Sequence, residues 1–406
     1  MENSHYASIK SLSELIRAQK VSPVELVELT LKRLDTYNSK LNAFITILAN
    51  EARSAAHKAE AGKWRGPLHG VPVAVKDFYD TAGIKTTGGF EQFKDRVPAK
   101  DAPLVAKLKE AGAIIVGKTN MDALGMETTG LTSAFGPVHN PWHAEYVPGG
   151  SSAGSAAAVA TGLCYATVDT DAVGSTRLPA ACCGVVGLKT SAGLIDGSGV
   201  LEGTQDPGEM IHLLSHVGIT ARTTEDAAVV LAALAKKPFD YAAGIDKPDH
   251  TLRIGIAKNI TASDEVLAIF TRAVEVFEKF GYSTREVTVP MDRPKFEATT
   301  IEKDRTEIGA LLFKDIDVLL TPTLVEPVIT VARAQSRGRQ AVSPANTFFV
   351  NYFSLAAITV PAGFTDKGLP LGLQLVCRAG READLLKIAY EYEHATEWGS
   401  RRPELS

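Results

Sequence analysis

The chain has 406 residues, a length that fits one large α/β domain or two smaller ones. Hydrophobic residues make up 45% of it and charged residues 22%, which is typical of a soluble globular protein and excludes a largely disordered chain. The 43 basic and 47 acidic residues give a net charge of −4, so the surface offers no general attraction to nucleic acid or anionic lipid. We therefore predict a small-molecule ligand, with no nucleic acid and no membrane as partner.

The first twenty residues have no apolar run behind a basic start, and no stretch approaches 18 consecutive apolar residues. These features predict a cytoplasmic protein. The nine histidines form no HExxH motif, and the four cysteines are too few and too irregular for a disulfide framework or a zinc site, so we expect no metal. Buried, reduced thiols are expected at Cys164, Cys182, Cys183 and Cys377.

A helix start is predicted at Ser22-Pro23, because the serine hydroxyl can cap the first turn, proline fits its backbone, and apolar residues recur at helical spacing up to Tyr37. Residues 42–48 have the pattern of a strand, and residues 50–63 that of an alanine-rich helix. Further apolar runs alternate with helical patterns, at residues 71–75, 113–116, 163–168, 253–257, 318–320, 358–360 and 373–376. This alternation predicts an α/β protein with a largely buried, mainly parallel or mixed sheet.

Residues 149–203 are unusually rich in glycine, serine and alanine, which lets backbones approach closely. A flexible linker would have a similar composition, but it would have no reason to carry the apolar segments 156–160 and 184–188. We therefore interpret this stretch as a packed catalytic core.

Lys76, Ser151 and Ser175 together suggest nucleophilic catalysis without histidine. A serine hydroxyl is a weak nucleophile at neutral pH, so Ser175 requires a base, and an unprotonated amine can serve where its surroundings disfavour charge. Lys76 follows the apolar run 71–75, and burial there would lower its pKa. Taken alone, Lys76 would be interpreted as an ion-pair partner of Asp77, and only the two serines favour the catalytic interpretation.

Ser151 lies in the turn PGGSSAG, where it would relay a proton between the amine and the nucleophile. The same residues are equally consistent with a serine-capped helix that begins near Ala153. Downstream, the backbone N–H groups of residues 172–175 are candidates to stabilise the oxyanion of an acyl transfer.

Several motifs, in order along nearly the whole chain, carry a resemblance to a known family: LHGVPVAVKD (68–77), GKTNMD (117–122), GPVHNPW (136–142), GGSSAGS (149–155), GLK (187–189), TPT (321–323) and LPLGLQ (369–374). At each of them the sequence resembles the amidase signature family. The resemblance implies an α/β/α sandwich around a large mixed β-sheet. It also implies one amidase domain over residues 1–406, with a helical N-terminal part at about 1–65 and a catalytic core at about 66–205.

By carry-over from the family, Ser175 is the nucleophile, Ser151 is a relay serine that follows a cis peptide bond, and Lys76 is the neutral base. The implied reaction cleaves the carboxamide of a small amide, through a serine-linked acyl-enzyme, to a carboxylic acid and ammonia or an amine. It needs no cofactor.

The resemblance also assigns an oxyanion hole to the amides of Ala172, Val173, Gly174 and Ser175. Substrate binding is predicted for Met121, Gly149 and Gly150, which lie in two of the motifs.

Two departures from the family pattern concern us. Val173-Gly174 stands where the family usually has two glycines, and Ala172 replaces a residue that is commonly hydroxylated. Because a β-branched residue is poorly tolerated at positive φ, either this backbone has an ordinary conformation or the oxyanion hole is altered.

The second departure is a shortened segment at about 291–314, where many relatives have a long helical excursion. The site would then be more open or walled by another protomer, so a homodimer is one alternative. Lys295, Lys303 and Arg305 are candidates to bind a substrate carboxylate, although a solvated helix face is the better interpretation. Arg177 is expected to brace the nucleophile loop rather than to bind substrate.

Three other interpretations stay open. The sequence GSSAG also matches the elbow of α/β-hydrolases, with Ser152 as nucleophile, although residues 143–148 make a poor preceding strand. A binding protein that kept the fold and lost catalysis is a second alternative, and the amidase subunit of a tRNA-dependent amidotransferase is a third.

Overall fold

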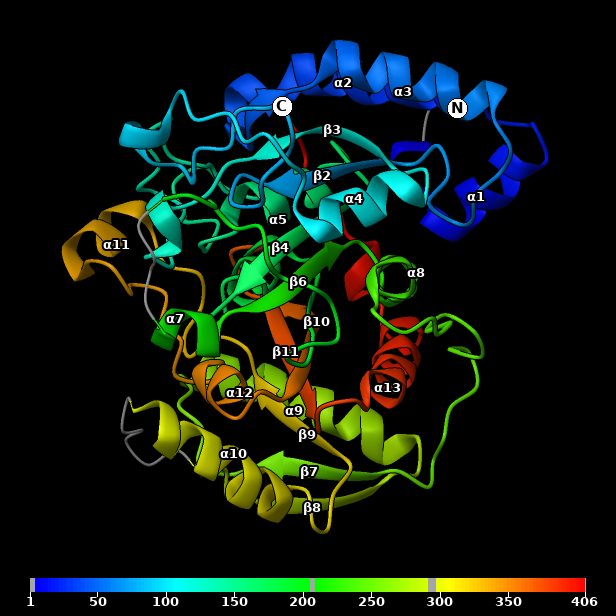
Figure 1. Cartoon of the computed structure of the whole chain (residues 1–406). Helices are drawn as coiled ribbons and strands as arrows, with labels where there is room; N and C mark the ends of the chain where they lie inside the picture. The colour runs from blue at the N-terminus through cyan, green and yellow to red at the C-terminus, as the bar shows by residue number, and fades with distance from the viewer. Residues whose placement is uncertain (1–3, 205–208, 291–296, 406) are drawn as a thin grey trace.

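The computed structural model describes residues 4–204, 209–290 and 297–405. Its described strands form one 11-stranded mixed sheet in the order β1-β3-β2-β4-β6-β5-β10-β11-β9-β7-β8, which runs from top to bottom in Figure 1. The strands are β1 (Phe44–Ile47), β2 (Pro72–Lys76), β3 (Ile114–Thr119), β4 (Ala166–Asp171), β5 (Val186–Lys189), β6 (His216–Ala221), β7 (Arg253–Ala257), β8 (Ser283–Val287), β9 (Val318–Pro322), β10 (Ala356–Phe364) and β11 (Pro370–Cys377).

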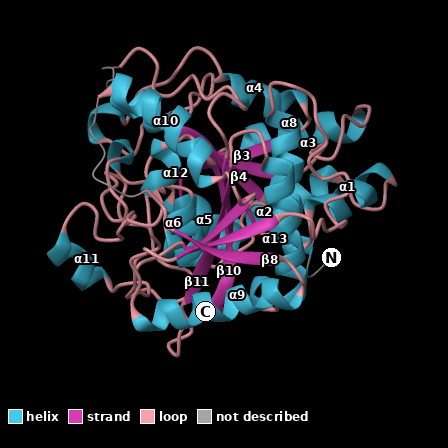
Figure 2. Ribbon diagram, turned by 90° about the horizontal axis from the view of Figure 1, so that it is seen from below, coloured by secondary structure: helices cyan, strands magenta, loops and turns pink. Residues whose placement is uncertain are grey.

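Helices cover both faces of the sheet, as Figure 2 shows. They are α1 (Ile9–Arg17), α2 (Pro23–Leu41), α3 (Ala49–Ala61), α4 (Pro103–Glu110), α5 (Ala153–Ala160), α6 (Arg177–Cys183), α7 (Glu209–Leu214), α8 (Thr224–Leu234), α9 (Asp264–Lys279), α10 (Ala298–Leu312), α11 (Val331–Arg337), α12 (Phe348–Tyr352) and α13 (Glu382–Ala395). Helices α8, α13 and α9 pack along one face, and α5 and α6 pack on the other. This arrangement confirms the predicted α/β class and mixed sheet.

The strand directions explain where the site lies. β2 is parallel to both β3 and β4, and β7 is parallel to β8 and β9, whereas the other pairs are antiparallel. Because β2 and β4 are parallel neighbours, their carboxyl ends, Lys76 and Asp171, lie at the same edge of the sheet. Ligand sites in α/β proteins commonly form at such an edge.

Local signals in the sequence gave correct helix starts. The Ser22 hydroxyl accepts hydrogen bonds from the N–H groups of Val24 and Glu25, and Pro23 opens α2, which continues to Leu41. The four cysteines are buried and unpaired, which confirms the prediction of reduced thiols. Among the described residues, no helix combines the length and the apolar character that crossing a bilayer requires.

Candidate active site

Lys76 projects from the end of β2 into a ring of three hydroxyl groups. Its Nζ atom lies 2.8 Å from Ser151 Oγ, 2.9 Å from Ser152 Oγ and 3.0 Å from Thr170 Oγ1. Thr170 belongs to the neighbouring strand β4, whereas the two serines come from the turn before α5. The structure therefore brings Lys76 and Ser151 into direct contact, and it adds Ser152 and Thr170 as partners of the amine, a role that the sequence predicted for neither of them.

The surroundings of Lys76 disfavour its charged form. The side chain is fully buried, and burial lowers its pKa to about 8, although the carboxylates of Asp169, Asp122 and Asp171 act in the opposite direction. Its adjacent residue, Asp77, lies 3.8 Å from the buried amine of Lys118. The interpretation of Lys76 as an ordinary partner of Asp77 is therefore wrong.

The turn that carries Ser151 is tightly packed. A cis peptide bond joins Gly150 to Ser151. A Cβ atom at Gly150 would lie 2.0 Å from Asp122 Oδ2, so no side chain fits there. That carboxylate accepts a hydrogen bond of 2.8 Å from the N–H group of Gly130, while the N–H group of Asp122 donates to the carbonyl of Ser151. Asp122 thus holds the Ser151 turn in place through both its carboxylate and its backbone N–H group.

Of the residues predicted to bind substrate, Met121 is fully buried. Gly149 has φ +74°, and a Cβ atom there would lie 2.9 Å from Pro179 Cα. Like Gly150, it is a point of close backbone packing. A direct substrate contact of Met121, Gly149 or Gly150 stays a prediction.

Ser175 lies in the turn after β4, and a backbone hydrogen bond links this turn to the Ser151 turn. The N–H group of Ser152 donates a 3.0 Å hydrogen bond to the carbonyl of Ser175, and the Ser175 side chain is buried. The turn is braced by Arg177, whose Nε and Nη2 atoms donate to the two carboxylate oxygens of Asp171 at 3.0 and 2.9 Å. Both partners of this ion pair are fully buried. The prediction that Arg177 braces the loop is confirmed.

One of the four predicted oxyanion donors is already occupied. The N–H group of Gly174 donates to Asp171 Oδ1 at 2.8 Å, so it does not face a substrate. Among the residues that the structure describes, the N–H groups of Ala172, Val173 and Ser175 have no hydrogen-bond acceptor. The positive φ of +133° falls on Gly174, and Val173 is absent from the residues with positive φ. Val173 therefore has an ordinary backbone conformation, which is the first of the two alternatives that its β-branched side chain raised.

Residues 339–347, which we call the strap, border both turns. The N–H group of Thr128 donates to the carbonyl of Arg339 at 3.2 Å, and Thr128 in turn packs against Gly150. At the other end, Thr347 Oγ1 donates to the carbonyl of Val173 at 2.5 Å. The strap thus crosses from the Ser151 turn to the Ser175 turn. No motif in the sequence predicted that the strap would contact both turns.

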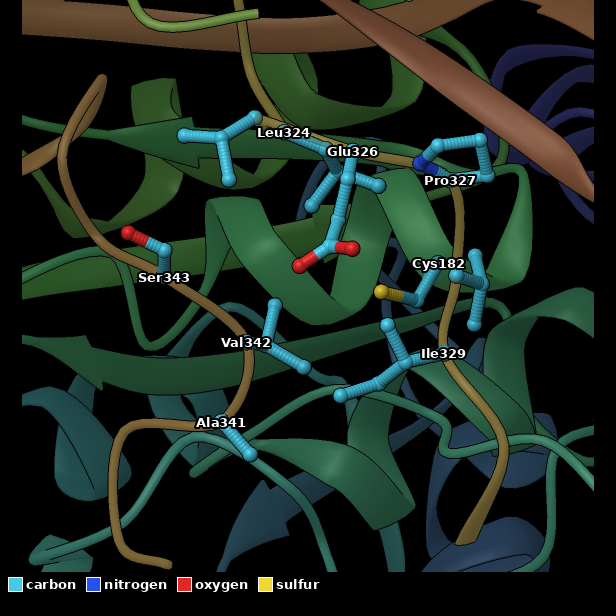
Figure 3. Close-up of a pocket in the computed structure, with 10 residues that line it drawn as sticks. Cys182, Leu324, Glu326, Pro327, Ile329, Ala341, Val342 and Ser343 are labelled. Atoms are coloured by element: carbon cyan, nitrogen blue, oxygen red, sulfur yellow. The ribbon is translucent and has the colours of Figure 1, made fainter. Parts of the chain in front are cut away.

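Two of the hollows in the described part of the fold show that the candidate site does not coincide with a large cavity. Figure 3 shows the first, which is lined by Cys182, the segment 324–329 and strap residues 341–343. Its volume of about 10 Å³ holds little more than a water molecule. The second, of about 340 Å³, lies around Phe280, Tyr390 and His394 and contains none of the predicted site residues. The polar contacts of Lys76, rather than either hollow, define the candidate active site.

The elbow interpretation with Ser152 as nucleophile is wrong. The residues that precede this serine form turns and irregular backbone instead of a buried strand. Helix α5 does begin at Ala153, as the capping alternative predicted, but the Ser152 side chain does not cap it and contacts Lys76 instead.

Comparisons with known proteins identify the family. The family model described as Amidase matches residues 25–302 and 294–386. The chain belongs to the amidase family. Curated relatives include glutamyl-tRNA(Gln) amidotransferase subunits of Geobacter sp. (strain M21) and Carboxydothermus hydrogenoformans, each 32% identical, over 98% and 99% of this chain and 99% of each relative.

Solved amidase-family structures share the whole fold. A 6-aminohexanoate cyclic dimer hydrolase superposes with a TM-score of 0.88, at 25% identity and 99% coverage of both chains. The corresponding glutamyl-tRNA(Gln) amidotransferase subunit from Thermotoga maritima gives 0.84 at 26% identity, covering 99% of this chain and 98% of that one. These similarities confirm the amidase signature fold that the motifs implied.

This member of the amidase family is shorter than the relatives it matches. Its alignment to the Geobacter protein extends over 486 positions, although the chain has 406 residues. The two segments matched by the family model meet at residues 294–302, inside the predicted shortened segment 291–314. Helix α10 occupies the described part of that segment.

Of the three cations in the shortened segment that were candidates to bind a substrate carboxylate, the structure describes two, and these have other surroundings. Arg305 donates to the backbone carbonyls of Tyr352 and Leu213 at 2.8 and 2.7 Å, so it has a structural role. Lys303 is exposed on α10, as expected for a solvated helix face, and Lys295 lies outside the described residues.

Proposed function

We propose that the protein is a serine amidase that hydrolyses a small carboxamide, with Ser175 as nucleophile, Ser151 as proton relay and Lys76 as neutral base. The observation that carries the proposal is the contact of a fully buried lysine amine with hydroxyl groups at 2.8 to 3.0 Å. No carboxylate oxygen among the described residues lies within 4.0 Å of this amine. A buried ammonium without a paired anion is costly, so this environment favours the neutral amine.

The hydroxyl ring also fits the hydrogen-bonding capacity of a neutral amine. Such an amine donates two hydrogen bonds and accepts one, whereas an ammonium ion only donates. With Ser152 and Thr170 as acceptors, the lone pair of Lys76 is left for the proton of Ser151. Ser151 can then accept the proton of Ser175, which makes that hydroxyl a competent nucleophile.

In the proposed reaction, Ser175 Oγ forms a bond to the amide carbon while its proton passes through Ser151 to Lys76. The developing oxyanion is stabilised by the free N–H groups of Ala172, Val173 and Ser175. Return of the proton to the leaving nitrogen breaks the C–N bond and releases ammonia or an amine. Water then attacks the acyl-enzyme by the same proton route, which yields a carboxylic acid and restores Ser175.

Release of ammonia from a panel of small amides tests this proposal. The natural protein is compared with Ser175→Ala and with Ser283→Ala, which removes an exposed hydroxyl on β8. We expect turnover in the natural protein and in Ser283→Ala and none in Ser175→Ala. Full activity of Ser175→Ala, or no turnover of any amide, would overturn the proposal.

A second candidate function is supported by the curated relatives, whose names describe one subunit of a glutamyl-tRNA(Gln) amidotransferase. In that case the same site would release ammonia from an amide for use by a partner protein. Purification of the tagged chain from its native cells, followed by mass spectrometry and RNA analysis, separates the two. A stoichiometric second protein together with tRNA favours the amidotransferase, and a lone chain or homodimer favours the independent amidase.

A further inference from the structure

The strap begins with an arginine that lies against residues 127–128, beside the Ser151 turn. Its first residue, Arg339, is anchored through its carbonyl by the N–H group of Thr128 at 3.2 Å. Thr128 lies against Gly150, because a Cβ atom there would be 2.9 Å from the carbonyl carbon of Thr128. Gly150 immediately precedes the relay serine. The backbone of Arg339 is therefore separated from the Ser151 turn by a single residue.

The other end of the strap is fixed at the nucleophile turn. Thr347 Oγ1 donates to the carbonyl of Val173, and a Cβ atom at Gly174 would come within 2.4 Å of the same oxygen. The strap is therefore bonded to Thr128, beside the Ser151 turn, through the backbone of Arg339, and to the Ser175 turn through Thr347. A group bound by Arg339 would lie on the Ser151 side of the site.

Of the three arginines in residues 326–339, Arg339 has the weakest contact with an acidic residue. Arg333 and Arg337, on α11, both pair with the carboxylate of Glu326. Arg339 has one acidic neighbour among the described residues, Glu127, at 4.0 Å, and its side chain is 77% exposed. Such an exposed, distant pair contributes little to stability, so the guanidinium is available to a ligand.

The local charge favours an anionic ligand. Residues 326–339 carry three arginines and one glutamate, in a chain whose net charge is −4. The planar guanidinium group matches the geometry of a carboxylate, with which it forms two parallel hydrogen bonds. Of the cations that the sequence suggested for this task, Lys303 is solvated, Arg305 is bound to backbone carbonyls and Lys295 lies outside the described residues.

We propose that Arg339 binds a carboxylate on the substrate, so that the preferred substrates are amides with an anionic group at the end opposite the scissile carboxamide. This inference rests on the proposed amidase function and specifies its substrate class. Monoamides of dicarboxylic acids belong to this class.

Two amides of equal length test the inference. Glutaramate carries a carboxylate where glutaramide carries a second carboxamide, so the pair differs chiefly in charge. The natural protein should have the higher kcat/KM for glutaramate, after allowance for the two equivalent amides of glutaramide. In Arg339→Gln, kcat/KM for glutaramate should fall roughly 10- to 100-fold, the range of a charge-assisted hydrogen bond, mainly through KM, while glutaramide stays within about twofold.

Two further variants provide controls. Arg285→Gln removes an exposed arginine of β8 that pairs with Asp315, and it should leave both amides unchanged. Glu127→Gln removes the carboxylate that competes for Arg339, and it should lower KM for glutaramate. Equal losses for both amides in Arg339→Gln, or no loss, would overturn the inference.

A binding measurement separates this inference from the proposed function. Calorimetry of glutaramate with Ser175→Ala should show binding that is lost when Arg339→Gln is added. Equal hydrolysis of both amides by the natural protein, with no effect of Arg339→Gln, would leave the amidase proposal standing and refute the carboxylate site. Binding that depends on Arg339 without any hydrolysis would refute the amidase proposal and retain the carboxylate site.

Discussion

The proposed role of Lys76 as the base predicts how catalysis depends on pH. Its pKa is about 8, because the amine is fully buried. The base acts only when neutral, and the neutral fraction of a group with this pKa is about 1% at pH 6, 50% at pH 8 and 90% at pH 9. The rate of the chemical step should therefore rise almost a hundredfold between pH 6 and pH 9 and then level off.

Single-turnover ammonia release, at saturating amide from pH 6 to pH 9.5, measures this step. An unshifted lysine, with a pKa of 10.5, would give a rate that still rises tenfold per pH unit at pH 9, without a plateau. A flat profile would refute Lys76 as the base. Residual activity in Lys76→Met with the midpoint unchanged would assign the titration to another group.

Protein stability provides an independent measure of the same pKa. The unfolded chain binds a proton at Lys76 up to about pH 10.5, whereas the folded chain releases it near pH 8. Between these values the unfolded state holds more protons, so the free energy of unfolding rises with pH, by roughly 3 kcal/mol for this one group. Chemical denaturation at pH 7.5 and pH 10 should show most of this increase in the natural protein relative to Lys76→Met.

Four further substitutions test the two turns. Gly174→Ala places a Cβ atom 2.4 Å from Thr347 Oγ1 at φ +133°, and it should lower both the melting temperature and kcat; an unchanged kcat would contradict the packing described here. Ser152→Ala leaves the lysine amine two of its three hydroxyl partners, so kcat should fall by about tenfold or less, which ammonia release would measure. Val173→Gly should cost at most about 1 kcal/mol, because this backbone is already ordinary, and a large loss of thermal stability would contradict that conformation. Asp171→Asn leaves a buried guanidinium without its anion and should destabilise the fold by about 3 to 5 kcal/mol in denaturant titrations.

Much of this fold could be predicted because its signals are local. The cap at Ser22 and the strand β7 depend on adjacent residues, and both were predicted at the right place. β8 was missed, because its residues are mostly exposed and show no apolar run. The strand β6 was also missed, since it is defined by its pairing with β4 and β5 rather than by its own sequence.

The candidate site also combines contacts that the sequence can predict with contacts that only the folded sheet creates. Contact between Lys76 and Ser151 was implied by motifs that lie 75 residues apart. Thr170, 94 residues from Lys76, could not be predicted, because only the parallel pairing of β2 with β4 brings it to the amine. The bond from the Gly174 N–H group to Asp171 spans three residues and could have been predicted, since an aspartate side chain readily accepts from backbone N–H groups of the following turn.

The two proposed roles, Lys76 as base and Arg339 as substrate contact, have different physical requirements, which explains why the first residue is buried and the second exposed. The proposed role of Lys76 as a neutral base requires exclusion of water, and the side chain is fully buried among the hydroxyl groups of the two turns and of β4. Recognition of a substrate needs access to solvent, which the exposed arginine of the strap has and Lys76 lacks. Ala341, Val342, Asn346 and Thr347 of the strap are buried, but the side chain of Arg339 is exposed and can change without disturbing the buried base. The chemistry of the core and the selectivity at the rim can therefore vary independently, as expected of a family in which one fold acts on many amides.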